Sequence, residues 1–221
     1  MGKSVISVAI DGPAGAGKST IANKVASILK LEYIDTGAMY RALTLKVLNE
    51  NKDPKNKDEV LKILKNSKID FDKKHILLDG KLVDEYIREN IISKNVSYVS
   101  QFKEVRQEMV FMQQEMANRK SVVMDGRDIT TVVLPNAKYK FFITATVEER
   151  ARRRYIELLD KGQADSTYTQ VLKDIKRRDE IDSSREIGPL TIADDAYVLD
   201  TTDKTIDESV DLIVNIIRGG S

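Results

Sequence analysis

The residues with the clearest chemical signature form a glycine-rich stretch near the N-terminus. Their spacing fits the phosphate-binding P-loop, with an apolar strand pattern before it and a helical pattern after it. Glycine lets backbone N–H groups wrap a phosphate chain, because no Cβ blocks the approach and φ can turn positive. The lysine can reach the β- and γ-phosphates of a triphosphate, and the serine hydroxyl can ligate Mg²⁺. The residues expected to bind ATP are Gly12, Pro13, Ala14, Gly15, Ala16, Gly17, Lys18, Ser19 and Thr20.

Two further motifs place charged residues where a second anion could bind. Asp125-Gly126-Arg127-Asp128 follows an apolar run, and an acid there matches the Walker-B position that holds Mg²⁺ directly or through water. Residues 35–41 follow another short strand pattern and lead into a helix that carries Arg41 in its first turns. We expect Thr36 to be the N-cap of that helix. Open α/β sheets bind ligands at the carboxyl ends of their strands, so both motifs should face one site.

Arginines are frequent in two helical patterns in the C-terminal half of the chain. Arg178, Asp182 and Arg185 are spaced at i, i+4 and i+7, which puts them on one helix face if the helix extends to Arg185. Residues 149–154 concentrate arginine on another helix, as a mobile lid over ATP would. A solvated, salt-bridged helix face is the alternative interpretation of both patterns.

Together the motifs predict two anion sites on one sheet. One would hold a triphosphate with Mg²⁺, and the other a smaller anionic acceptor lined by Arg41, Arg127, Arg178 and Arg185. No side chain resembles a covalent nucleophile. The pattern therefore favours direct in-line phosphoryl transfer, in which positioning and charge neutralisation supply the catalysis.

Composition narrows the class of protein without deciding it. The 221 residues carry a formal charge of +1, so nothing global indicates a nucleic-acid polymer or a membrane as partner. Cysteine is absent, which excludes disulfides and thiolate chemistry and is compatible with the cytoplasm, where we expect the protein to act. The single histidine, His75, is expected in a surface loop. No apolar run reaches membrane-spanning length.

Hydrophobic periodicity predicts the elements that must position these motifs. Strand patterns alternate with helical patterns, which indicates an α/β fold with a P-loop-type parallel sheet flanked by helices. Asp79-Gly80 between apolar runs predicts a hairpin, and hence a small antiparallel sheet inserted among helices. The helices are expected at residues 18–30, 36–48, 60–64, 99–116, 147–159, 168–182 and 206–217, with a polar loop at residues 49–58.

These motifs together resemble bacterial cytidylate kinases, within the nucleoside monophosphate kinases. The similarity includes residues 10–20, 35–41, 125–128 and 178–190, where Gly188-Pro189-Leu190 follows the arginines. It implies transfer of phosphate from ATP to CMP or dCMP with Mg²⁺, in a monomer. It also implies one kinase domain over residues 1–221. The core of this domain would consist of residues 1–35, 117–148 and 170–218. Residues 36–116 would form a monophosphate-binding region that contains the small sheet, and residues 149–169 a short helical lid.

The resemblance also implies roles for individual residues. Arg41, Arg127 and Arg185 would bind the CMP phosphate, and Arg178 and Asp182 the sugar. Cytosine would contact Ser97, Arg106 and Asp128, with Thr36 and Tyr40 completing the CMP site, while Arg150, Arg153 and Arg154 are the lid candidates for ATP. Lys18, Arg127 and Arg185 would be catalytic, and Ser19 and Asp125 would hold Mg²⁺.

Base selection has a direct chemical rationale. Cytosine offers an exocyclic amine that can donate to the Asp128 carboxylate, whereas uracil presents a carbonyl that the carboxylate would repel. Two alternatives remain open from the residues alone: a kinase of the same fold acting on UMP or AMP, and a nucleotide-binding switch that phosphorylates no metabolite.

Overall fold

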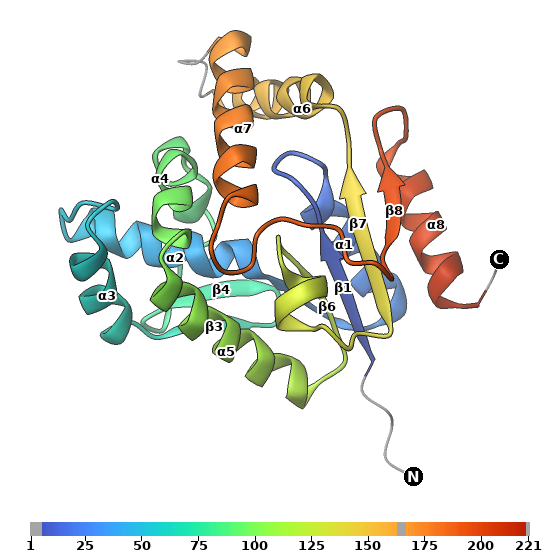
Figure 1. The fold of residues 1–221 in the computed structure, drawn as a ribbon, viewed down its shortest axis with the longest axis horizontal. Coiled ribbons are helices and arrows are strands. Elements are labelled where there is room, and N and C mark those ends of the chain that lie inside the picture. The colour runs from blue at the N-terminus through green and yellow to red at the C-terminus, as the bar shows by residue number, and fades with distance from the viewer. Residues whose placement is uncertain (1–5, 163–166, 220–221) are drawn as a thin grey trace.

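The computed structural model describes residues 6–162 and 167–219, and its centre is a five-stranded parallel sheet (Figure 1). The strand order is β2-β6-β1-β7-β8, and each neighbouring pair is parallel. The strands are β1 (Ser7–Asp11), β2 (Glu32–Asp35), β6 (Val122–Asp125), β7 (Tyr139–Thr144) and β8 (Tyr197–Asp200). The predicted α/β fold class is confirmed.

Helices cover both faces of this sheet because its central strand is apolar on both sides. Val8 and Ile10 pack with α1 (Lys18–Leu29) and α8 (Ile206–Ile217), while Ala9 between them belongs to the core on the other face. This alternation follows from the two-residue period of a strand. The P-loop therefore follows directly after the buried residues 8–11 of the central strand.

A second lobe contains the inserted sheet and has its own apolar core (Figure 1). The strands β3 (Ile69–Asp72), β4 (His75–Leu78) and β5 (Lys81–Leu82) pair antiparallel. Asp79 and Gly80 both have positive φ, as the predicted tight hairpin turn requires. The helical elements of this lobe are α2 (Thr36–Asn49), α3 (Lys57–Lys65), a 3₁₀ turn (Tyr86–Arg88), α4 (Asn90–Ser100) and α5 (Lys103–Arg119).

Several predicted boundaries in this lobe are wrong. The single helix expected over residues 99–116 is two helices, because Phe102 takes an extended backbone conformation between α4 and α5 and packs against the apolar core. Helix α3 begins one turn before the predicted range, at Lys57. His75 is exposed as expected, but it lies on β4 and not in a loop.

The N-cap of α2 is Asp35 and not Thr36. The Asp35 carboxylate accepts a hydrogen bond from the Ala38 backbone N–H at 2.9 Å. The Thr36 hydroxyl instead donates to the carbonyl oxygen of Asp125 at 2.7 Å. That bond ties the start of α2 to the end of β6, two motifs that both belong to the expected acceptor site.

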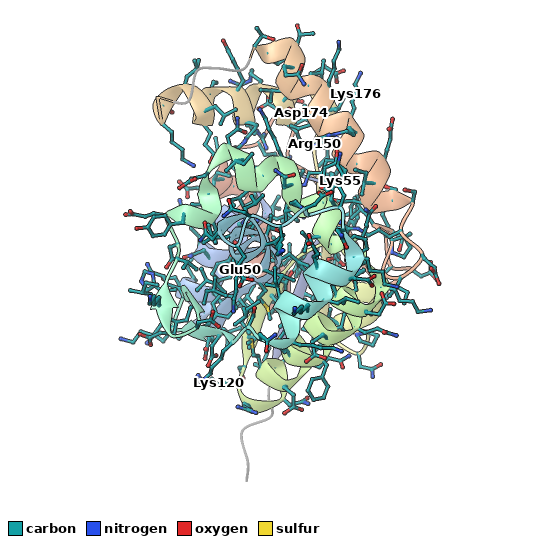
Figure 2. All side chains as sticks on the ribbon, turned by 90° about the vertical axis from the view of Figure 1, so that its left-hand side faces the viewer. Glu50, Lys55, Lys120, Arg150, Asp174 and Lys176 are labelled. Atoms are coloured by element: carbon teal, nitrogen blue, oxygen red, sulfur yellow. The ribbon has the colours of Figure 1, made fainter. Side chains whose placement is uncertain are left out.

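The helices α6 (Val147–Asp160) and α7 (Tyr168–Ser183) pack against each other above the carboxyl ends of the strands (Figure 1). Arg150 lies between these two helices (Figure 2). Residues 163–166 of the range expected to form a lid lie outside the described residues. A π-helical segment (Ile129–Val133) follows Asp128.

Replacing Met109 by alanine should lower the free energy of unfolding by about 2–5 kcal/mol, because it leaves a cavity in the core of the second lobe. The matched control is Phe111→Ala on the same helix, where the side chain is 60% exposed and the expected change is within about 0.5 kcal/mol. Urea denaturation of both variants measures the difference. Equal destabilisation by the two substitutions would contradict the assignment of the core face of α5.

Candidate active site

The P-loop connects β1 to α1 and closes around the side chain of Lys18. Gly12, Gly15 and Gly17 all have positive φ, and a Cβ on Gly12 would lie 1.9 Å from the carbonyl oxygen of Ile143. The Lys18 ammonium donates to the carbonyl oxygen of Pro13 at 2.7 Å. Burial, and then the positive charge of Arg127, lower the pKa of Lys18 well below its ordinary value. An anion bound in the loop would stabilise the charged lysine, and the N-terminus of α1 would favour the same anion.

Asp125 provides a buried carboxylate beside the P-loop. It accepts hydrogen bonds from the Ser19 hydroxyl at 2.9 Å and the Tyr33 hydroxyl at 2.8 Å. Burial, and then the nearby Asp35 carboxylate, raise the pKa of Asp125 to about 6. These oxygen donors suit Mg²⁺, which prefers carboxylates and hydroxyls together with water. Tyr33 was not predicted as a site residue, since its strand pattern alone does not tell which face of β2 it occupies.

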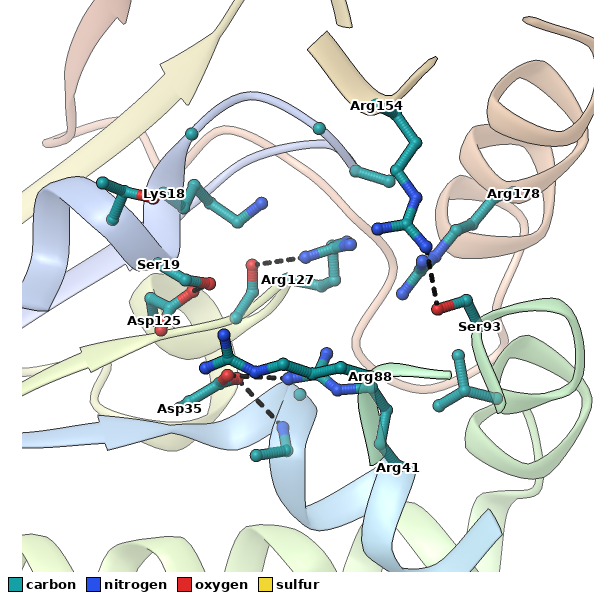
Figure 3. A pocket seen from close by; sticks show the side chains of 18 of the residues that line it. Lys18, Ser19, Asp35, Arg41, Arg88, Ser93, Asp125, Arg127, Arg154 and Arg178 are labelled. Atoms are coloured by element: carbon teal, nitrogen blue, oxygen red, sulfur yellow. Dashed lines mark hydrogen bonds and ion pairs between the residues drawn. The ribbon is translucent and has the colours of Figure 1, made fainter. Parts of the chain in front are cut away.

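The turn after Asp125 passes very close to α2. A Cβ on Gly126 would lie 2.5 Å from the Thr36 hydroxyl, so only glycine allows this approach. Arg41 extends from α2 into the cavity and pairs with the Asp35 carboxylate at 2.7 Å (Figure 3). The 35–41 motif and the 125–128 motif thus form one wall, as the sequence predicts.

Asp182 holds two of the predicted phosphate-binding arginines. Arg127 donates from Nε to one carboxylate oxygen at 2.7 Å, and Arg185 pairs with the other oxygen. Although burial opposes it, the charges of Arg127 and Arg185 hold the pKa of Asp182 below its ordinary value. Helix α7 ends at Ser183, so Arg185 reaches Asp182 from the turn after the helix and not from its face. Arg185 also donates to the Ser100 hydroxyl at 2.9 Å.

Arg178 lines the same cavity and forms no ion pair with a carboxylate of the described residues. Among the described residues its Nε has no hydrogen-bond partner, although the atom is buried. Burial and the neighbouring charge of Arg127 lower the pKa of Arg178. Arg178 is therefore a suitable partner for an anionic ligand, because a bound negative charge would offset its repulsion from Arg127.

Two of the three predicted base-reading residues, Arg106 and Asp128, form a buried pair at the far end of the cavity. Arg106, 1% exposed, pairs with Asp128 and donates to the carbonyl oxygen of Ser100 at 3.2 Å. Ser97 and Tyr40 also line this end of the cavity. A Cβ on Gly188 would lie 2.1 Å from an Asp128 carboxylate oxygen, so the backbone of the loop after α7 packs directly against the pair.

The three predicted lid arginines occupy different environments. Arg150 is buried and committed to the carbonyl oxygen of Ala14 at 3.1 Å and to Asp179 at 2.7 Å, and it is outside the described lining of the cavity. Arg153 lines the cavity and donates to the carbonyl oxygen of Thr201 at 2.6 Å. Arg154 projects toward the centre of the cavity near Arg178 (Figure 3).

The predicted site residues line one continuous cavity of about 1410 Å³ that runs from the P-loop to Asp128, except for Gly12, Pro13, Ala16 and Arg150, which are outside its lining. Three further arginines, Arg88, Arg152 and Arg177, line it and were not predicted. Arg88 lies opposite the P-loop, near Asp35 (Figure 3). An isolated arginine in a polar segment gives no sequence signal, which explains why it was missed.

Asp11 is the last residue of β1 and directly precedes the P-loop. Its carboxylate is buried and accepts hydrogen bonds from the backbone N–H groups of Ile129 and Thr130, at 2.9 and 2.7 Å, and from the Thr130 hydroxyl at 2.6 Å. Burial raises the pKa of Asp11 to about 6, although these hydrogen bonds act in the opposite direction. Asp11 belongs to the motif at residues 10–20, but the sequence indicates no role for it.

A buried parallel sheet, a P-loop at its central strand and an arginine-lined cavity facing that loop define a P-loop phosphotransferase of the small-molecule kinase class. The family model described as Cytidylate kinase matches residues 8–219, and the chain belongs to that family.

Curated relatives are similar over nearly the whole chain. A cytidylate kinase from Caldanaerobacter subterraneus subsp. tengcongensis is 53% identical over 213 residues, which are 96% of this chain and 95% of that protein. One from Clostridioides difficile is 54% identical over 211 residues, 96% of this chain and 97% of that protein. A solved structure of an uncharacterised protein from Eubacterium ventriosum shares the fold, with a TM-score of 0.54 and 13% identity over 96% of this chain and 98% of that one.

Within residues 6–162 and 167–219, no helix combines the length and apolar character needed to cross a membrane.

The raised pKa of Asp11 predicts a pH dependence of stability. The folded protein binds this proton more tightly than the unfolded chain does, so between about pH 4 and 6 the free energy of unfolding should fall as pH rises. One such group contributes a slope of up to about 1.4 kcal/mol per pH unit. Asp11→Asn removes this contribution, and urea denaturation across that range should give a flatter or rising curve. Parallel curves for the two proteins would show that Asp11 does not titrate there.

Proposed function

We propose that this protein catalyses ATP-dependent phosphorylation of CMP and dCMP to CDP and dCDP. The observation that carries the proposal is the single cavity in which the P-loop and the arginine cluster around Asp182 face each other. Such a cavity holds two phosphorylated ligands at once. Membership in the cytidylate kinase family supplies the identity of the acceptor.

The P-loop end of the cavity would hold ATP. Its backbone N–H groups and the Lys18 ammonium would contact the β- and γ-phosphates, and Ser19, Thr20 and Asp125 would lie beside them. Mg²⁺, held by Ser19 and Asp125 directly or through water, would neutralise phosphate charge when bound. Arg153 and Arg154 line the cavity from α6 and would contact ATP, whereas Arg150 would need to leave Ala14 and Asp179 to do so.

The arginine cluster would hold the acceptor phosphate. Arg41, Arg127 and Arg185 each pair with a carboxylate, and a doubly charged phosphate offers more acceptor oxygens to the same guanidinium groups. Thr36 and Tyr40 would complete the wall formed by α2, and Arg178 and Asp182 would contact the sugar. The carboxylates then serve to orient the arginines before the acceptor arrives.

The far end of the cavity would read the base. The exocyclic amine of cytosine can donate to Asp128, with Arg106 and Ser97 as further polar partners. A carbonyl at that position, as in uracil, would face the carboxylate and be repelled. Discrimination based on a buried polar pair can reach about 10⁴-fold.

With both ligands bound, the reaction needs positioning more than covalent chemistry. An oxygen of the acceptor phosphate would attack the γ-phosphorus of ATP, forming a new P–O bond as the bond to the β-phosphate oxygen breaks and ADP leaves. Lys18, Arg127 and Arg185 would stabilise the negative charge that spreads over the transferring group. No side chain of the protein would become covalently modified in this route.

Further expectations belong to the same proposal. The chain would act as a single kinase domain over residues 1–221, with a core, a monophosphate-binding region and a lid as the sequence predicts. It would act as a monomer in the cytoplasm, on small nucleotides, without a nucleic-acid or membrane partner.

The experiment that tests this proposal is an ADP-release assay with ATP and Mg²⁺, to which CMP, dCMP, UMP, AMP and GMP are added separately. CMP and dCMP should stimulate turnover far more than the other monophosphates. Lys18→Ala should reduce kcat by at least about a hundredfold while the protein stays folded, because the cation on the transferring phosphate is lost. Stimulation by a different monophosphate would overturn the acceptor assignment, and no stimulation by any would indicate a nucleotide-binding switch.

Asp128→Asn should lower the ratio of kcat/KM for CMP over UMP by at least about tenfold, because the amide can also donate to a carbonyl. The KM for ATP should change little. A suitable control is Asp195→Asn, since Asp195 pairs with the buried Lys140 at 2.8 Å and neither residue lines the cavity. An unchanged CMP:UMP ratio in Asp128→Asn would show that other residues read the base.

A further inference from the structure

Asp11 is a fully buried carboxylate that has no part in the reaction proposed above. It ends the central strand β1 and is followed directly by Gly12, the first residue of the P-loop. Among the described residues, its carboxylate accepts hydrogen bonds from Ile129 and Thr130, at the start of the π-helical segment, and none from the P-loop.

These donors follow Asp128 immediately, so they end the turn that carries the proposed acceptor contacts. The turn begins with a second tie to the same strand, because the Gly126 N–H donates to the carbonyl oxygen of Ile10 at 2.9 Å. Arg127 and Asp128 therefore lie in a short turn whose two ends are both hydrogen-bonded to β1. The two anchoring residues of β1, Ile10 and Asp11, are adjacent.

The two ties differ in kind. The first is an ordinary bond between neighbouring strands, which any residue at position 10 would supply through its carbonyl group. The second depends on a side chain that offers acceptor oxygens to two N–H groups and one hydroxyl at the same time. Only a carboxylate of this length meets that requirement, since an amide presents a donor in place of one oxygen.

We propose that Asp11 is a positioning residue for acceptor selection, which holds the Arg127–Asp128 turn at a defined place relative to the P-loop. This inference rests on the proposed function. Because the strand that carries Asp11 also carries the P-loop, the distance between the phosphate donor and the base-reading carboxylate is set within one rigid element. Asp11 itself touches neither ligand and acts through Asp128 and Arg127.

Asp11→Asn is the first test, because the amide keeps the shape of the side chain but cannot accept from both N–H groups. The CMP:UMP ratio of kcat/KM should fall about tenfold, the effect of one lost hydrogen bond, and the KM for CMP should rise. The KM for ATP should stay within about twofold. Asp195→Asn, which alters a carboxylate away from the cavity, should leave all three quantities unchanged.

Thr130→Val is a second, milder variant that removes only the hydroxyl donor and keeps the side-chain volume. It should shift the CMP:UMP ratio in the same direction by less, and it carries the test if Asp11→Asn does not fold. The double variant should be no worse than Asp11→Asn alone, because both substitutions act on one contact. If the two substitutions instead lowered the CMP:UMP ratio by independent factors that multiply in the double variant, Asp11 would not act through Thr130.

Two results would overturn the inference. One is a lower melting temperature of Asp11→Asn with an unchanged CMP:UMP ratio, which would make Asp11 a stabilising residue only. The other is a rise in the KM for ATP that exceeds the rise for CMP, which would mean that Asp11 acts on the P-loop. If the proposed function itself were wrong, the unsubstituted protein would show no CMP-stimulated ADP release. That result distinguishes a failure of the proposed function from a failure of the inference about Asp11.

Discussion

Charge balance in the cavity is the constraint on which the rest of the site depends. Arg127 and Arg185 share the buried carboxylate of Asp182, and Arg106 has that of Asp128. An uncompensated buried charge is very costly, so each of these cations needs a partner before any substrate arrives. The carboxylates meet this need and also aim the guanidinium groups into the cavity. A phosphate that enters can therefore find donors already oriented, which lowers the entropy lost on binding.

The order of the strands explains how motifs far apart in the sequence meet. Strand β1 lies between β6 and β7, so the P-loop at its end is beside Asp125 at the end of β6. Parallel strands bring their carboxyl ends to one edge, and α2 begins there as well, tied to Asp125 by Thr36. The arginines proposed to bind the acceptor phosphate lie on segments that pass over this edge of the sheet. The sheet is thus the frame that turns separate motifs into one cavity.

Local chemistry made much of the fold predictable. The largely apolar β1 and β6 patterns indicate buried parallel strands, and Asp79-Gly80 indicates a tight turn, because these signals depend on backbone geometry within a few residues. The break between α4 and α5 was not predictable, since no glycine or proline marks it. Phe102 interrupts the helix because its side chain packs in the core of the second lobe, and that core exists only once distant segments have folded together.

The same division applies to the candidate site. The P-loop, the Asp125–Asp128 turn and the abundance of arginines are evident from the amino-acid sequence, because each depends on residue type and short-range spacing. Which carboxylate each arginine pairs with is visible only in the folded protein: Arg150 pairs with Asp179 beside the P-loop, and Arg185 reaches Asp182 from beyond the end of α7. Tertiary structure alone also brings Tyr33 to Asp125 and Thr130 to Asp11. Except for Arg185 and Asp182, these pairings join residues far apart in the chain. The order and register of the strands and the packing of α6 on α7 determine which of them come within hydrogen-bonding distance.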